Sequence, residues 1–118
     1  LSDEQINLLS KLVAAEARGE SYEGQVAVAA VVLNRVQDSR FPDSIEGVIY
    51  QKNAFSVVRN GYIKAERTEE SDKAVKDALY GNDPTNNAIY FWNPDISTCN
   101  WINTLNPHLR IGNHVFAR

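Results

Sequence analysis

The sequence has no methionine and a single cysteine, Cys99. A lone cysteine cannot form an internal disulfide, and no residues typical of an activated thiol flank this one. No apolar run reaches the roughly 18 residues that a membrane-spanning helix needs. Because the chain starts at Leu1 and lacks methionine, we expect a mature or excised segment. Its length and apolar content predict one domain over residues 1–118, held together without a disulfide or a metal.

Clusters of Lys and Arg are also missing, and the formal net charge is −3. Recognition of nucleic acid depends on a basic patch, so we expect no nucleic-acid partner. His108, His114 and Cys99 match no spacing of zinc ligands, and we expect neither a metal site nor a cofactor. Neutral or mixed-charge substrates such as glycans remain open.

What is present begins with a well-marked helix. Ser2 and Gln5 have the spacing of a capping box, and Gly19 is a typical left-handed C-terminal cap. These signals predict a helix over about 3–17. Its apolar residues share one face at about 100° per residue, namely Ile6, Leu9, Leu12 and Val13.

Glu16 falls near the centre of this apolar face. A carboxylate directed at a core either pairs with a cation or keeps its proton at a raised pKa. The negative end of the helix dipole favours the second outcome, which produces a general acid at neutral pH. The alternative is a Glu that pairs with Arg18 or turns to solvent.

Ser21 predicts the start of a second helix that ends near Val36. Residues 25–36 are apolar almost all the way round, which is typical of a buried helix. A buried strand is the alternative. Arg35 is an exception in this run, and its side chain can cap carbonyl groups or reach an acidic neighbour.

Shorter elements follow. Asp43 and Glu46 have capping-box spacing and predict a short helix to about Tyr50. Residues 53–58 are predicted to be extended, with a turn at Asn60-Gly61.

A further helix is predicted over 69–80, with Thr68 as its N-cap. Its apolar residues are expected to point inward, namely Ala74, Val75, Ala78 and Leu79.

Two strand candidates, 88–94 and 111–116, are expected to pair as a small antiparallel sheet. Four ring-bearing residues are then expected to converge on this sheet, namely Tyr90, Trp92, Trp101 and His114. Aromatic faces beside Asn side chains suit sugars, because rings stack on C–H surfaces while amides bond hydroxyl groups. A role in the core is the alternative, and Phe55 has the same two interpretations.

A shielded acid beside such a groove points to glycosidic bond cleavage. Glycosidases normally use a second carboxylate, and the candidates are Glu20, Glu23 and Asp95. The alternative for Glu20 is a cap, or a partner for Arg18 or Arg35.

Several segments together form a distinctive pattern. They are E-A-R-G-E over 16–20, the run over 22–36, Phe41-Pro42, Ala54-Phe55, Asn82-Asp83-Pro84, 88–91, Asn93-Pro94, Trp101-Ile102 and 111–116. This pattern resembles the catalytic domain of the spore cortex-lytic, cell-wall hydrolase family and covers nearly all of the chain from about Ile6. Members close to the spore enzymes often carry a Cys where this chain has Ala117, which argues against an essential thiol there.

The resemblance implies an α+β fold: a mainly helical, lysozyme-like domain with a buried central helix and a small antiparallel sheet near the C-terminus. It implies that Glu16 is the catalytic glutamate of a lytic transglycosylase acting on peptidoglycan glycan strands. Such an enzyme closes a 1,6-anhydro ring, so it needs no second carboxylate. A muramidase that uses water and a non-catalytic wall-binding module remain alternatives.

The resemblance also implies an exported protein of the cell wall or the spore cortex and coat region, with a role in cortex lysis during germination. The candidate substrate-binding residues are Glu20, Phe55, Tyr90, Phe91, Asn93, Trp101 and His114.

Overall fold

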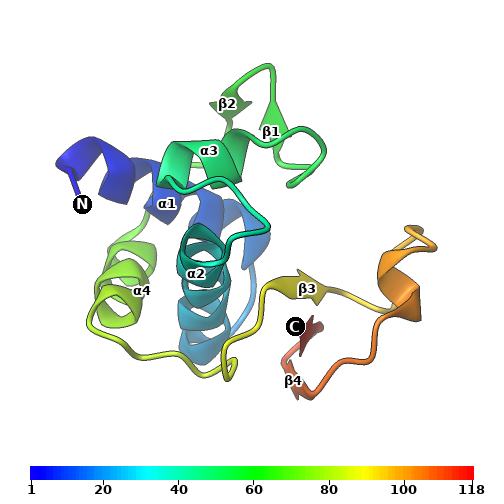
Figure 1. Cartoon of the computed structure of the whole chain (residues 1–118). Helices are drawn as coiled ribbons and strands as arrows, with labels where there is room; N and C mark the ends of the chain where they lie inside the picture. Colours follow the sequence, from blue (N-terminus) through cyan, green and yellow to red (C-terminus); the bar gives the residue numbers. More distant parts are fainter.

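The structure is a computed structural model that describes residues 1–118, and it confirms the α+β fold (Figure 1). Helices form one part of the molecule, and a small sheet with a long connecting segment forms the part at the right of Figure 1. The helices are α1 (Asp3–Glu16), α2 (Tyr22–Gln37), α3 (Ile45–Tyr50) and α4 (Glu69–Leu79). None of them is both long enough and apolar enough to cross a membrane.

Helix α2 is the centre of the helical part and contacts each of the other three helices. It is buried because apolar side chains surround it, which confirms the predicted central helix and excludes the strand alternative. Ala27, Ala29 and Ala30 are all at most 3% exposed. Their small side chains let neighbouring elements approach this helix closely.

The predicted N-caps of three helices are confirmed. The capping box of α1 has both bonds, from the Gln5 amide to Ser2 Oγ (3.1 Å) and from the Ser2 amide to Gln5 Oε1 (3.0 Å). Ser21 caps α2, and Thr68 caps α4. These bonds satisfy amides that have no partner within the helix, so each helix begins where its cap stands.

The predicted capping box of α3 is wrong. Ser44 is the N-cap, and its hydroxyl accepts from the Gly47 amide at 2.9 Å. A Cβ at Gly47 would stand 2.9 Å from Ser44 Oγ, so the missing side chain permits this contact. The helix therefore starts one residue later than Asp43 indicates.

Helix α4 confirms three of its four predicted inward residues. Ala74, Val75 and Ala78 are buried, whereas Leu79 is 39% exposed. Leu79 is the last residue of the helix and lies at the edge of the buried stripe, so its inward prediction is wrong.

Two short strands, β1 (Val58–Arg59) and β2 (Tyr62–Ile63), form a hairpin. The predicted turn Asn60-Gly61 joins them, and both turn residues have positive φ. The extended segment predicted over 53–58 is wrong for most of its length, because only Val58 belongs to a strand.

The second sheet has the order β3-β5-β4 and is antiparallel throughout, with β3 (Tyr90–Trp92), β4 (Leu109–Ile111) and β5 (His114–Ala117). Pairing of β3 with β5 confirms the predicted pairing of the two strand candidates. The single strand predicted over 111–116 is wrong, because Gly112 at φ +58° turns the chain there. Ile111 and His114 therefore face each other across a hairpin.

The two faces of this sheet have different surroundings. Phe116 packs with Ala27 and Val31 of α2, and Phe91 packs against the same cluster. Trp92 and Val115 lie on the opposite face, which is covered by the segment that carries a short 3₁₀ helix, η1 (Ile102–Thr104). The sheet is thus held between the helical part and this segment.

Candidate active site

Glu16 is the last residue of α1, at the point where the chain leaves the helix. Its side chain is half-buried beside the apolar face that contains Leu12 and Val13. The carboxylate makes no hydrogen bond or ion pair within the protein, and neither of its oxygens is enclosed without a partner. Both oxygens therefore remain free to contact a ligand.

The environment of Glu16 adjusts its acidity. Burial raises the pKa of Glu16 from the ordinary 4.5 to about 7, although the positive charge of Arg35 lowers it in part. Since no carboxylate contributes to this pKa, Glu16 acts as an isolated acid. A group with a pKa near neutrality can both donate and accept a proton at that pH.

Arg35 is a buried cation in α2, and its guanidinium is surrounded by rings. Its Nε donates to the Ile89 carbonyl at 2.7 Å, and its Cζ lies 5.0 Å from the centroid of Phe41, 5.3 Å from Phe55 and 5.7 Å from Tyr90. Cation–π contacts are strongest when water is excluded, as it is here. Burial lowers the pKa of Arg35 to about 10, so it stays charged at neutral pH.

Arg35 thus bonds a carbonyl of a distant segment rather than the end of its own helix. It lowers the pKa of Glu16 without forming an ion pair with it. The three rings come from separate parts of the chain, so sequence reasoning missed this cluster.

Glu20 holds the helical part and the sheet together. Its carboxylate accepts from the backbone amide of Asn113 at 3.0 Å and from the side-chain amide at 2.9 Å. A Cβ at Gly112 would stand 2.3 Å from Glu20 Oε1, so the turn needs glycine at that position. The partner of Glu20 is therefore this turn, and the alternative of a pairing with Arg18 or Arg35 is wrong.

The other candidate carboxylates are exposed. The side chain of Asp95 is 74% exposed and lies 3.6 Å from Arg110. Glu23 is exposed in the first turn of α2. Of the four candidate carboxylates, only Glu16 is both half-buried and without a hydrogen bond or ion pair.

Tyr90 and Trp101 lie together. Their ring centroids are 5.3 Å apart at 76°, in an edge-to-face arrangement, and Trp101 is 57% exposed. Tyr90 also contacts the ring of Phe41 and the guanidinium of Arg35. The exposed indole of Trp101 thus borders the ring cluster around Arg35, the cation that lowers the pKa of Glu16.

Phe55, Phe91 and His114 form a second chain of rings. Phe55 and Phe91 are 6.3 Å apart, and Phe91 meets His114 edge to face at 5.1 Å. His114 is 9% exposed, and its Nδ1 is buried without a hydrogen-bond partner. Burial lowers the pKa of His114, and the charge of Glu20 raises it in part.

The expected convergence of four ring-bearing residues is only partly correct. Tyr90 and Trp92 share one face of the sheet because side chains alternate along a strand, whereas His114 lies on the other face with Phe91. Asn93 follows β3, and its side-chain oxygen accepts from the Asp95 amide at 2.9 Å. The sheet therefore presents its aromatic residues to two separate environments.

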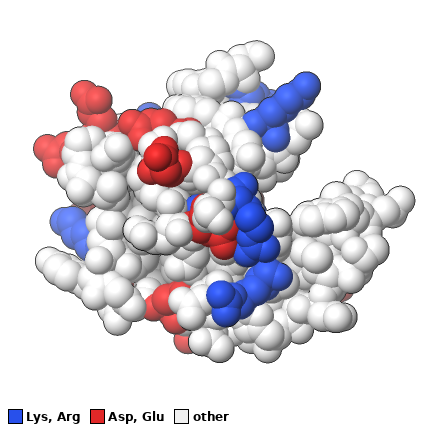
Figure 2. Space-filling view, viewed as in Figure 1, with Lys and Arg blue, Asp and Glu red and all other residues white.

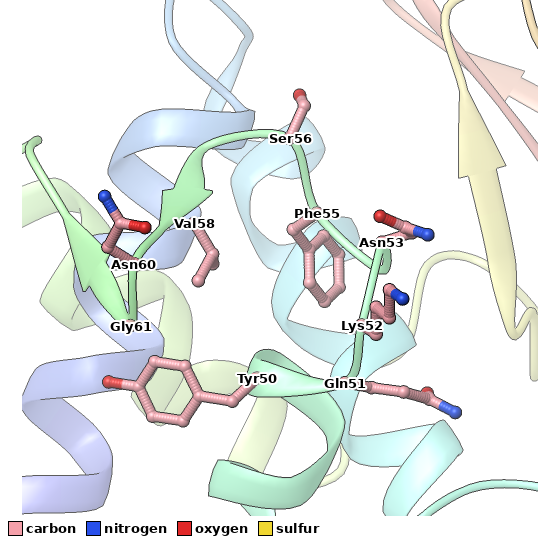
Figure 3. Close-up of a pocket in the computed structure, with 9 residues that line it drawn as sticks. All are labelled: Tyr50, Gln51, Lys52, Asn53, Phe55, Ser56, Val58, Asn60 and Gly61. Carbon is pink, nitrogen blue, oxygen red and sulfur yellow. The ribbon is translucent and has the colours of Figure 1, made fainter.

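The surface between the β1–β2 hairpin and the C-terminal segment is hollowed on the face shown in Figure 2. The C-terminal wall of this hollow is almost free of charged residues in that view. A pocket of about 460 Å³ lies beside Phe55, between the end of α3 and the hairpin (Figure 3). Tyr50, Asn53 and Asn60 contribute polar groups to it. Lys52 is its one charged residue. Rings and amides together suit a carbohydrate chain.

Comparison with known proteins gives consistent results. The profile of the family described as Cell Wall Hydrolase matches residues 19–117. The spore cortex-lytic enzyme of Oceanobacillus iheyensis is 47% identical over 117 residues, which cover 99% of this chain and 42% of that protein. The chain spans less than half the length of the spore cortex-lytic enzymes that it matches.

Two solved structures have the same fold. The catalytic domain of the Bacillus cereus SleB protein is 47% identical with a TM-score of 0.91, over 99% of this chain and 91% of that one. The catalytic domain of the germination-specific lytic transglycosylase SleB from Bacillus anthracis is 46% identical with a TM-score of 0.94, over 100% of this chain and 97% of that one. From the family profile, the sequence identity and the shared fold, we conclude that this chain belongs to the cell wall hydrolase family.

Proposed function

We propose that residues 1–118 form one catalytic domain, a lytic transglycosylase that cleaves peptidoglycan between N-acetylmuramic acid and N-acetylglucosamine. The observation that carries this proposal is Glu16, a half-buried carboxyl with a pKa of about 7 and no second carboxylate beside it. Membership of the cell wall hydrolase family and the relatives named as cortex-lytic enzymes support the substrate class.

The reaction begins with Glu16 as a general acid. Its proton passes to the glycosidic oxygen while the bond from that oxygen to C1 of the muramoyl residue breaks. The leaving N-acetylglucosamine then carries a new 4-hydroxyl group. Water solvates the half-buried carboxylate poorly, so Glu16 keeps its proton to a higher pH than a surface carboxyl does. A carboxyl that is protonated near neutral pH can supply the proton for this step.

The second step uses Glu16 as a base. The carboxylate accepts the proton of the muramoyl 6-hydroxyl as that oxygen bonds to C1, which closes the 1,6-anhydro ring. The nucleophile belongs to the substrate, so no carboxylate is needed to activate water. Arg35 stabilises the carboxylate form between the two steps, since its charge lowers the pKa of Glu16.

The remaining candidate residues are assigned to substrate binding and support. Trp101 offers an exposed ring for a sugar face and packs against Tyr90. The side-chain amide nitrogen of Asn93, which follows the strand that carries Tyr90, can bond a sugar hydroxyl. Phe55 and Phe91 support the Arg35 cluster, and the buried His114 packs edge to face against Phe91.

Glu20 acts indirectly in this scheme. Its two bonds to Asn113 fix the sheet against the end of α1.

Two other activities make different products. A muramidase, with Glu20 or Asp95 activating water, would leave hydrolysed ends, and a wall-binding module would leave the glycan intact. The paired state of Glu20 and the exposure of Asp95 weigh against the muramidase.

Mass spectrometry of digested sacculi tests the proposal. We expect muropeptides with anhydro ends, which are one water lighter than hydrolysed ends. The Glu16→Gln variant should keep its fold and its binding to sacculi and lose cleavage by at least about 100-fold. Hydrolysed ends, or substantial cleavage by the variant, would contradict the assignment.

Because the substrate is the wall, we propose an exported protein that acts at the cell wall or the spore cortex during germination. Parallel digestion of cortex and vegetative sacculi separates the two sites of action. Faster release of anhydro products from cortex is the expected result.

A further inference from the structure

A groove with three basic residues lies between the end of α1 and the β1–β2 hairpin. Its volume is about 1070 Å³, and nine residues line it. Arg18, Arg59 and Lys64 are among them, and no acidic residue is. Tyr62, which is 63% exposed, adds an aromatic surface. We call this site the basic groove.

The three cations of the basic groove have no partners within the protein. The ion pairs of this chain are Arg40 with Asp38, Arg67 with Asp72, and Arg110 with Asp95. None involves a residue of the groove, although Asp and Glu outnumber Lys and Arg by 15 to 12 in the chain. In Figure 2, Lys and Arg side chains gather over the hairpin with no Asp or Glu beside them. An anion placed there would gain attraction from several charges at once.

The basic groove lies at the same end of α1 as Glu16. Ala15 and Arg18 line it, so the residues just before and shortly after the proposed acid face it. Strand β2 contacts α1, which fixes the hairpin beside this helix end. The groove also shares Asn60 with the pocket of Figure 3. Glu16 itself does not line the groove, because Ala15 and Arg18 point to another side of α1. The helix is about 10 Å across, a separation that an extended peptide of three or more residues spans at about 3.3–3.6 Å per residue.

We propose that the basic groove binds the carboxylates of the peptide stem attached to the muramoyl residue at the cleavage site. This inference rests on the proposed function. The two sugars of peptidoglycan are uncharged once the lactyl group carries its peptide, so the negative charge lies on the stem. The stem starts from the same muramoyl residue whose C1 is attacked. Guanidinium and ammonium groups match carboxylates in charge and hydrogen bonding.

The test compares two variants of equal charge. Arg59→Gln with Lys64→Gln removes two cations from the groove, and neither residue belongs to the proposed catalytic machinery. Lys73→Gln with Lys76→Gln removes two from α4, which lies away from the hairpin in Figure 1. A general weakening of attraction to an acidic polymer affects both double variants alike.

Two soluble, uncrosslinked strands serve as substrates, both stripped of anionic wall polymers. One carries native acidic stems, and the other carries stems whose carboxylates have been chemically amidated. On native stems, we expect the groove variant to lose roughly 2- to 30-fold in kcat/KM, which corresponds to two solvent-exposed charge pairs. On amidated stems, it should match the wild type, and the α4 variant should match the wild type on both.

Other results overturn the inference. Equal loss on both substrates, or no loss on either, shows that the groove does not read stem carboxylates. A third substrate, native strands that retain their wall polymers, tests the other anion. Loss of activity on this substrate alone assigns the groove to those polymers instead. A wild-type protein that cleaves neither substrate overturns the proposed function itself, whereas cleavage with unchanged groove variants overturns only the assignment of the stem.

Discussion

The Glu16→Gln variant tests whether burial raises the pKa of Glu16, independently of whether Glu16 takes part in catalysis. Gln resembles the protonated carboxyl in shape and cannot ionise. The fold raises the pKa of Glu16 from 4.5 to about 7, so the native state holds the proton more tightly than the unfolded chain. The resulting stability is fully present below pH 4.5 and is lost as the pH rises to about 7. The Gln variant does not suffer this loss.

The size of the effect follows from the pKa values. Each pKa unit corresponds to about 1.4 kcal/mol, so the rise from 4.5 to about 7 is worth about 3 kcal/mol. The free energy of unfolding of Glu16→Gln, relative to the wild type, should therefore increase by about 3 kcal/mol between pH 4.5 and pH 8. All other ionisable groups are the same in the two proteins and cancel in the difference.

Urea unfolding of both proteins at several pH values measures this difference. We expect a curve that rises between the two pKa values and levels off above pH 8. A difference that stays constant with pH would show that Glu16 titrates as an ordinary surface carboxyl. That result would refute the reasoning on burial, even if the variant were inactive.

Three further changes follow from the same structure. Activity should fall as the pH rises and Glu16 loses its proton. In Arg35→Met this fall should move to higher pH, because loss of the cation raises the pKa of Glu16 further. Arg35→Lys keeps the charge and should keep the pH–rate profile. The free energy of unfolding of Arg35→Met should also fall by about 1–3 kcal/mol, because a buried carbonyl loses its donor. A pH–rate profile that does not move would show that the role of Arg35 is purely structural. Glu20→Ala should lower the free energy of unfolding by about 1–2 kcal/mol through its two bonds to Asn113, and Glu20→Gln should keep most activity. Inactive but folded Glu20→Gln would favour the water-using muramidase. Trp101→Ala should raise KM roughly 2- to 12-fold with little change in kcat or stability. Steady-state kinetics that show a lower kcat and an unchanged KM would contradict a role of Trp101 in sugar binding.

The helices were largely predictable because their signals are local. The caps at Ser2, Ser21 and Thr68 bond to amides three residues away, so they work without the rest of the fold. The position of Glu16 on an apolar face is equally a property of helical spacing. Errors of one residue arose where two cap candidates stand side by side, as at Asp43 and Ser44.

The strands were less predictable because they depend on distant partners. The β3–β5 pairing was expected, but the turn at Gly112 inside the last strand candidate was not. That turn determines the alternation of side chains along β5, and so the face on which His114 lies. Misplacing it put His114 beside Trp92 when they occupy opposite faces.

The sequence by itself determined where the acid stands: at the end of an apolar helical face, in a chain whose motifs match one family. Only the tertiary structure decided what surrounds it. Arg35 meets rings from residues 41, 55 and 90, and Glu20 reaches residue 113. Contacts between residues so far apart along the chain depend on how the helices and the sheet pack together. Local spacing can place a carboxyl on a helix face, but its pKa depends on desolvation and charge contributed by the whole fold.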